Sequence, residues 1–126
     1  MLYVIAYILS LLPFRILFAV SDVLAWLACD VVRYRRSAVR GNLESSFPEK
    51  SREEIRKIEK RFYRFLCDYF METLKLASMS EKKMRRHLKV ENIEEINDAV
   101  EKGQSVTLYL GHYCNWEWVS SLPLHI

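Results

Sequence analysis

The stretch "SREEIRKIEKRFYRFLCDYFMETLKLASM", residues 51–79, has the longest helical periodicity in the chain and decides much of its fold. It predicts one amphipathic helix of roughly seven turns, because its apolar residues recur every three or four positions. These apolar residues are Ile55, Ile58, Phe62, Phe65, Leu66, Tyr69, Phe70 and Leu74. Ser51 followed by Glu54 matches a capping box and marks the start of the helix. We interpret the cationic positions as a solvated face, and they are Arg56, Lys57, Lys60 and Arg64.

Upstream of this helix, residues 1–32 are overwhelmingly apolar, whereas residues 33–102 carry most of the charge. The apolar run has the length to cross a bilayer core, for which about 20 residues suffice. Pro13 and Arg15 interrupt it, so two membrane arrangements stay open: a single bent spanning helix, and a helical hairpin in the interface whose second helix starts at Pro13. A soluble pair of core helices is a third interpretation, but the run lacks the polar stripe of such helices. We expect residues 1–32 to be a membrane anchor.

Four arginines follow the apolar run within a short stretch: Arg33, Arg35, Arg36 and Arg40. Arginines clustered beside an apolar segment mark its cytoplasmic side and attract anionic lipid head groups. We therefore expect these four residues to contact anionic lipid, and the rest of the chain to lie in the cytoplasm against the membrane.

Composition excludes several classes of protein. The 126 residues and 51% hydrophobic content suit one modest domain, and a net charge of +3 without an RNA- or zinc-binding pattern argues against nucleic acid as a partner. Cys29, Cys67 and Cys114 are widely spaced, so they are interpreted as reduced thiols in a cytosolic setting rather than as disulfides or metal ligands. The cysteines form no metal-ligand grouping.

A second basic cluster, "SEKKMRRHLK", occupies residues 80–89. Two interpretations stay open: a short solvated helix, and an anion-facing patch for a phosphorylated lipid or an acidic carrier protein. Within it, His87 has no second His or Cys at metal-ligand spacing and is interpreted as a surface residue.

The last third of the chain predicts alternating strands and helices. "LKVEN" (88–92) and "SVTLYLG" (105–111) are the strand candidates, the second of them buried. Between them, a helix is expected to follow Asn92 and to stop at Gly103, and another helix is expected to begin just after Asn115. The predicted class is therefore α/β, beginning with helices and continuing into a sheet. Because two strands make only a marginal sheet, we expect this chain to be the N-terminal part of a larger domain.

The segment "LGHYCNWEW" (110–118) places His112 five positions before Glu117. On one regular helix these side chains would point about 140° apart, but at the end of a strand and the start of a helix they can meet. A histidine held by a carboxylate is a general base that takes a proton from a hydroxyl group. Neither a G-x-S-x-G motif nor any sign of activation at Cys114 accompanies the pair, which favours direct attack by a hydroxyl on an acyl donor. Purely structural roles for both residues remain the alternative.

Three segments together carry a family resemblance. "GHYCNWEW" (111–118) resembles the G-H-[FY]-x-N-W-E signature of the bacterial lipid A biosynthesis acyltransferases, the lauroyl and myristoyl transferases. "YRRSAVRGNLESSFPE" (34–49) and "FYRFLCDYFMETLKL" (62–76) are similar to the region that precedes this signature in the family. The resemblance covers essentially the whole chain.

The resemblance implies an enzyme of the bacterial inner membrane with its catalytic side facing the cytoplasm. Such an enzyme transfers a fatty acyl group from acyl carrier protein to a hydroxyl of a membrane-bound lipid A precursor, without metal or cofactor. His112 would then be the general base and Glu117 its orienting partner, while Gly111, Asn115 and Trp116 would shape the turn. Cys114 stands where the family often has glycine.

Residues 33–126 are accordingly expected to form the N-terminal part of a truncated α/β domain like that of the glycerolipid acyltransferases. Without the remaining pocket we expect this chain alone to be inactive. A coenzyme A-linked donor stays open, and two other functions remain as alternatives. One is a glycerophospholipid acyltransferase, although its acid is usually Asp rather than Glu117. The other is a non-catalytic, membrane-anchored remnant.

Overall fold

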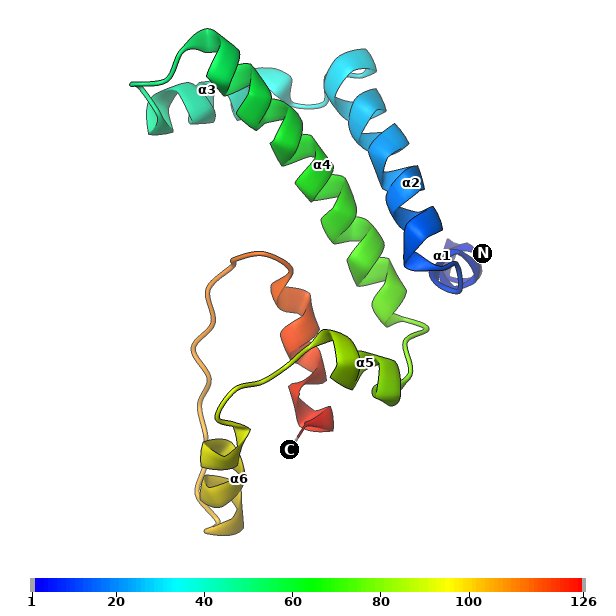
Figure 1. Ribbon diagram of the computed structural model, residues 1–126, viewed down its shortest axis with the longest axis vertical. Helices are drawn as coiled ribbons and strands as arrows, with labels where there is room; N and C mark the ends of the chain where they lie inside the picture. The colour runs from blue at the N-terminus through cyan, green and yellow to red at the C-terminus, as the bar shows by residue number, and fades with distance from the viewer. Residues whose placement is uncertain (1, 126) are drawn as a thin grey trace.

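The computed structural model describes residues 2–125 and shows a helical protein. Helices make up 71% of the described residues, and no strand forms among them, so the prediction of an α/β fold is wrong (Figure 1). The α-helices and their bounds are α1 (Leu2–Ser10), α2 (Phe14–Trp26), α3 (Arg36–Ser46), α4 (Arg52–Leu76), α5 (Glu81–His87) and α6 (Ile93–Glu101). A π-helical turn, η1 (Leu27–Val31), extends α2, and a 3-10 helix, η2 (Trp116–Leu124), follows a long extended connection.

The long helix α4 confirms the amphipathic helix predicted within residues 51–79. Its capping box is formed, because the backbone N–H of Ser51 donates to the Glu54 carboxylate at 2.9 Å and the Glu54 N–H donates to Ser51 Oγ at 3.3 Å. The buried side chains on its first four turns lie four residues apart, at Ile55, Glu59, Tyr63 and Cys67. The core-facing stripe of α4 therefore includes a fully buried carboxylate.

The helix α2 runs antiparallel to α4 and packs along it (Figure 1). Leu17, Ser21 and Ala25 form its buried stripe, again at a spacing of four residues. Two of these three side chains are small, which lets the two backbones approach closely. Ser21 Oγ also donates to the carboxylate of Asp68 on α4 at 2.6 Å. This contact fixes the register between the two helices.

The apolar N-terminal segment forms two short helices, with the break just before Pro13 as the sequence predicts. The buried ammonium of Lys75 closes this turn by donating to the carbonyl oxygens of Ser10 at 2.7 Å and Leu12 at 2.9 Å. Burial, followed by repulsion from Lys83, lowers the pKa of Lys75. None of the helices that the structure describes combines the length and the apolar character needed to span a bilayer.

The predicted strands are absent for a physical reason. A strand must pair its N–H and C=O groups with a neighbouring strand, and residues 2–125 offer no such partner. Residues 105–111 are accordingly extended and exposed rather than buried, with Tyr109 at 94% exposure. The helix α6 between the strand candidates forms as expected, and Gly103 just beyond it has the left-handed φ of +69° typical of a helix stop.

Candidate functional site

The last third of α4 holds the start of η2 through two side-chain contacts. The Tyr69 hydroxyl donates to Glu117 Oε1 at 3.1 Å, and Asn115 Nδ2 donates to Glu72 Oε2 at 2.8 Å. Tyr69 and Glu72 lie three residues apart on α4, so they form neighbouring positions on one face. α4 therefore holds Asn115, which precedes η2, and Glu117, which is the second residue of η2.

The structure places His112 and Glu117 on the same turn but does not bring their side chains together. The exposed imidazole of His112 packs edge-on against Trp116, with 4.7 Å between ring centroids and 61° between ring planes. No hydrogen bond or ion pair links His112 to Glu117, both of which the structure describes, and one oxygen of the Glu117 carboxylate is bound to Tyr69 instead. Trp116, expected to shape the turn, is thus the direct partner of His112.

The turn itself is tight. The Tyr113 N–H donates to the Gly111 carbonyl at 2.8 Å, and Cys114 has a φ of +51°, in the left-handed region that favours glycine. Asn115 occupies the position before η2, as predicted, but its side chain reaches Glu72 rather than capping the helix. The hydrogen bond to Glu72 of α4 takes the place of a local helix cap.

Burial raises the pKa of the Tyr69 phenol, and its hydrogen bond to the Glu117 carboxylate raises it further. Both effects disfavour the phenolate. Tyr69 therefore remains a protonated donor to Glu117 at neutral pH, which keeps that carboxylate in place. The second carboxylate oxygen, Oε2, has no protein donor within the described chain.

Two cavities border this turn. One of about 410 Å³ is lined by Glu117 and mainly by apolar side chains, including Leu108 and Leu110. The other, of about 570 Å³, is lined by Asn115, Trp118 and neighbouring aromatic rings. Asn115 Oδ1 and Trp118 Nε1 are buried and have no hydrogen-bond partner in residues 2–125. Two residues that line the second cavity therefore each hold one buried polar atom that no described group satisfies.

An aromatic cluster forms one wall of the second cavity. Phe14 of α2 stacks on Trp118 of η2 with 6.5 Å between ring centroids. The ring of His87, from α5, lies 5.3 Å from Phe14 and 6.0 Å from Trp118. His87 is therefore part of a packed contact between three helices, although it is exposed as the sequence predicts.

The four arginines expected to contact lipid divide into two pairs. Arg36 Nε and Arg40 Nη2 bind the two oxygens of Glu59 at 2.7 and 2.5 Å, and Glu59 is completely buried. Burial raises the pKa of Glu59, but the two guanidinium groups outweigh it and hold the pKa below its usual range. Arg33 and Arg35 are exposed and have positive φ angles of 55° and 49°. The first pair ties α3 to α4, whereas the second is free to contact other molecules.

Sequence reasoning missed Tyr69, Glu72 and Glu59. Tyr69 was assigned to the apolar periodicity of α4, and only its hydroxyl links it to the turn. The available signal for Glu59 was its spacing of four residues from Ile55 and Tyr63, which places it on the buried face.

The sequence has a family match over nearly its full length. Residues 1–122 match the profile of the family described as bacterial lipid A biosynthesis acyltransferase. The chain belongs to this family. Membership gives it a transferase class and a role in lipid A biosynthesis, part of lipopolysaccharide synthesis. Comparisons with curated proteins and with solved structures gave no match.

Proposed function

We propose that this protein contributes the catalytic base for transfer of a fatty acyl group from acyl carrier protein to a hydroxyl of a lipid A precursor. The observation that carries the proposal is the turn at residues 111–117, which carries His112 five positions before Glu117 and is held to α4 by two hydrogen bonds. The family match supplies the reaction class. In this proposal the reaction needs no resident metal or cofactor.

The proposed step is a direct transfer. His112 removes the proton of the acceptor hydroxyl, and the oxygen attacks the thioester carbonyl of the donor. The tetrahedral intermediate collapses to the ester and expels the carrier thiolate, which takes the proton back from the imidazolium. Glu117 stabilises the imidazolium with its unoccupied oxygen, while Tyr69 holds the other oxygen. This role requires the exposed His112 ring to turn from Trp116 toward Glu117.

The surroundings of the turn support a lipid substrate. The cavity beside Glu117 is lined mainly by apolar side chains, which suits a hydrocarbon chain. The outer faces of α1 and α2 are also apolar and exposed, which supports an interfacial hairpin on the cytoplasmic side of the bacterial inner membrane. Arg33 and Arg35 remain the proposed contacts with anionic lipid on that side.

The proposal is tested with membranes from cells that express the intact gene. Acyl transfer to a lipid A precursor is measured with His112→Ala and Glu117→Gln, and with His125→Gln as a histidine control outside the turn. We expect His112→Ala to lose at least about 100-fold in rate, in the range typical of a general base. Full activity of His112→Ala would contradict the assignment.

Parallel reactions identify donor and acceptor. Acyl carrier protein and coenzyme A thioesters are compared as donors, and a lysophospholipid is offered as the competing acceptor. Preference for the lysophospholipid would favour glycerophospholipid acylation instead.

We further propose that residues 1–126 alone do not turn over, because His112 is exposed and unpaired with Glu117. Turnover by the isolated chain would contradict this expectation.

A further inference from the structure

The short helix α5 and the residues just after it form a basic surface that the proposed acyl transfer does not yet use. Residues 80–91 contain five cations and two acids, so this segment has an excess of three positive charges. The cations, called here the α5 patch, are Lys82, Lys83, Arg85, Arg86 and Lys89, and all five side chains are exposed.

Neighbouring acids leave most of the α5 patch unneutralised. Arg85 Nε lies 3.0 Å from Glu81, and none of the other four cations has a carboxylate oxygen within 4 Å in residues 2–125. Lys83 is close enough to the buried ammonium of Lys75 to lower its pKa, and Lys75 itself binds carbonyl oxygens rather than a carboxylate. The buried cation therefore adds to the positive potential of the α5 patch.

Two of these cations lie together on the outward face of α5. Lys82 and Arg86 each stand two residues from Met84, which is 5% exposed, so each lies about 160° around the helix from this buried residue. They are four residues apart and are therefore neighbours on one face. The outward face of α5 thus presents an ammonium and a guanidinium group that have no ion-pair partner within the described chain.

The α5 patch lies next to the turn at residues 111–117. The ring of His87, the last residue of α5, is 6.0 Å from the ring of Trp118, and Figure 1 shows α5 beside η2. The cavity of about 570 Å³ is lined by His87 and Leu88 from the end of α5, and by Cys114 and Asn115 from the turn. This cavity therefore lies between the end of α5 and the turn that carries the proposed base.

The surroundings of the α5 patch favour an acidic protein over a bilayer as its partner. A helix that lies on a bilayer buries an apolar face in it. In the described chain, however, no large apolar side chain between residues 71 and 99 is exposed, whereas α1 and α2 expose many, such as Ile8, Ile16 and Val23. A basic surface without an apolar anchor matches contacts in which complementary charge selects and steers a protein partner.

We propose that the α5 patch is the docking surface for the acidic carrier protein that delivers the acyl donor. The inference rests on the proposed function, because it names the surface that receives the donor of that reaction. Acidic side chains of the carrier pair with Lys82 and Arg86, and the docked carrier holds its thioester at the cavity that Cys114 and Asn115 line. The geometry thus favours the carrier-protein interpretation of residues 80–89 over a lipid contact or a merely solvated helix.

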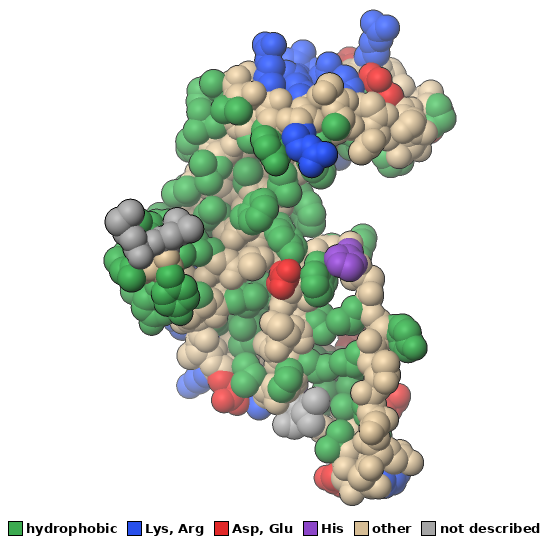
Figure 2. All heavy atoms as spheres, turned by 180° about the vertical axis from the view of Figure 1, so that it is seen from behind, with side chains coloured by type: hydrophobic (Ala, Val, Ile, Leu, Met, Phe, Trp, Pro, Cys, Tyr) green, Lys and Arg blue, Asp and Glu red, His purple; other side chains and the backbone are tan. Residues whose placement is uncertain are grey.

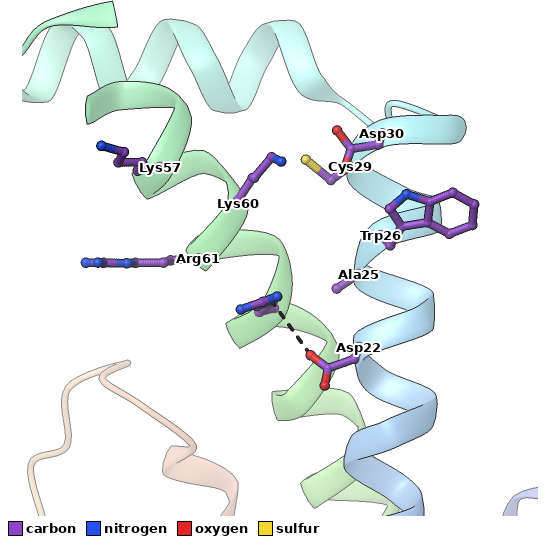
Figure 3. A pocket seen from close by; sticks show the side chains of 9 residues that line it. Asp22, Ala25, Trp26, Cys29, Asp30, Lys57, Lys60 and Arg61 are labelled. Carbon is purple, nitrogen blue, oxygen red and sulfur yellow. Dashed lines mark ion pairs between the residues drawn. The ribbon is translucent and has the colours of Figure 1, made fainter. Parts of the chain in front are cut away.

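The first test measures binding of fluorescent acyl carrier protein to the protein from the intact gene in neutral detergent micelles. The variant Lys82→Gln/Arg86→Gln is compared with Lys57→Gln/Arg61→Gln, which removes one lysine and one arginine at the same spacing. Figure 3 shows Lys57 and Arg61 extending from the side of α4 away from α2, and both are exposed. We expect the α5 variant to bind about 10-fold more weakly, as for the loss of two exposed charge pairs, and the control to change less than about twofold. The difference should vanish in 1 M salt, where the Debye length is about 3 Å.

The second test separates docking from chemistry. Acyl transfer is measured with acyl carrier protein and with the thioester of N-acetylcysteamine, a small neutral donor that has no acidic surface. For the carrier-protein donor, we expect Lys82→Gln/Arg86→Gln to raise KM about 10-fold without lowering kcat, because it removes binding rather than a catalytic group. Transfer from the neutral donor should match that of the native protein. His112→Ala, in contrast, should lose transfer from both donors and still bind the carrier protein, so failure of one proposal is distinguishable from failure of the other.

Three outcomes would overturn the docking surface. Carrier-protein binding that is unchanged in Lys82→Gln/Arg86→Gln, or that falls equally in the α4 control, would mean that no specific contact involves α5. Loss of transfer from the neutral donor would mean that α5 supports the turn instead of the partner. Weaker binding to vesicles containing phosphatidic acid, with carrier-protein binding unchanged, would identify a lipid contact. Circular dichroism checks that both variants remain helical.

Discussion

Cys114 has a backbone conformation that a side chain disfavours. Its φ of +51° lies in the left-handed region, which costs a non-glycine residue about 1–2 kcal/mol. We expect Cys114→Gly to leave the free energy of unfolding unchanged or to raise it by up to about 1 kcal/mol, because the relieved strain exceeds the added entropy of the unfolded chain. Urea unfolding measures the change.

A matched control separates this effect from the general cost of glycine. Ala38 lies on the exposed side of α3 in ordinary helical geometry. Ala38→Gly should lower the free energy of unfolding by about 1 kcal/mol. A loss of the same size in Cys114→Gly would show that the turn does not strain Cys114.

Tyr69 is a positioning residue for Glu117. Removing its hydroxyl in Tyr69→Phe leaves the ring in place and frees Glu117 Oε1. We expect kcat for acyl transfer to fall about 10-fold with little change in KM, as is usual when a group that orients a functional side chain is lost. A rise in KM without a change in kcat would contradict the positioning role.

The sequence identifies the turn better than it identifies the contacts around it. His112, Glu117 and the start of η2 at Trp116 follow from a local motif and a local helix start. The contact from Tyr69 joins residues 48 positions apart, and no local pattern encodes it. An aromatic residue at helical spacing indicates burial, whereas the partner of its hydroxyl depends on the tertiary fold.

At the scale of elements, the carboxylate of Glu59 joins α3 to α4. Two arginines of α3 bind it, and its side chain is completely buried. Glu59→Gln keeps the shape but leaves both guanidinium groups without their charge partner, so we expect the free energy of unfolding to fall by about 3 kcal/mol. Glu53→Gln, which removes an exposed i,i+4 pair on the same helix, should change it by less than about 1 kcal/mol.

The same carboxylate makes stability depend on pH. Its pKa in the folded protein is lowered from the unfolded value of about 4.3, so below that pH the unfolded chain binds a proton that the folded chain does not. The contribution of Glu59 is complete above pH 4.3 and is lost as the pH falls through the folded-state pKa. The free energy of unfolding, measured across this pH window, should depend less steeply on pH in Glu59→Gln than in the native protein. An unchanged slope would place the acid sensitivity elsewhere.

The helix boundaries that the sequence predicts correctly are those marked by a local signal. The capping box set the start of α4, Pro13 separated α1 from α2, and Gly103 followed α6. The strand predicted at residues 105–111 does not form. The sequence of this segment favours an extended conformation, but it does not show whether a partner strand is present. Extended backbone forms a sheet only when another strand satisfies its hydrogen bonds.

At the scale of the whole molecule, a core in which α2 packs against α4 contrasts with the extended connection between α6 and η2. Figure 2 shows Lys and Arg gathered at one end of the molecule, with hydrophobic side chains spread over the surface below. Tyr109 and Tyr113 in the connection are 94% and 84% exposed, whereas Tyr63 in the core is 1% exposed.

This contrast predicts where a protease cuts first. Brief digestion with chymotrypsin should cleave after Tyr109 or Tyr113 well before any site in α4, because cleavage requires an exposed and flexible backbone. Mass spectrometry of the first fragments identifies the site. Early cleavage after Tyr63 would mean that the α2–α4 core opens as readily as the connection.

The three thiols of the described chain differ sharply in accessibility. Cys29 and Cys67 are buried, and burial raises the pKa of each thiol, whereas Cys114 is exposed. A maleimide dye should therefore attach at Cys114 alone under mild conditions. The native sequence thus provides a fluorescent reporter two residues from His112, able to register arrival of an acyl donor or a membrane without any engineered cysteine.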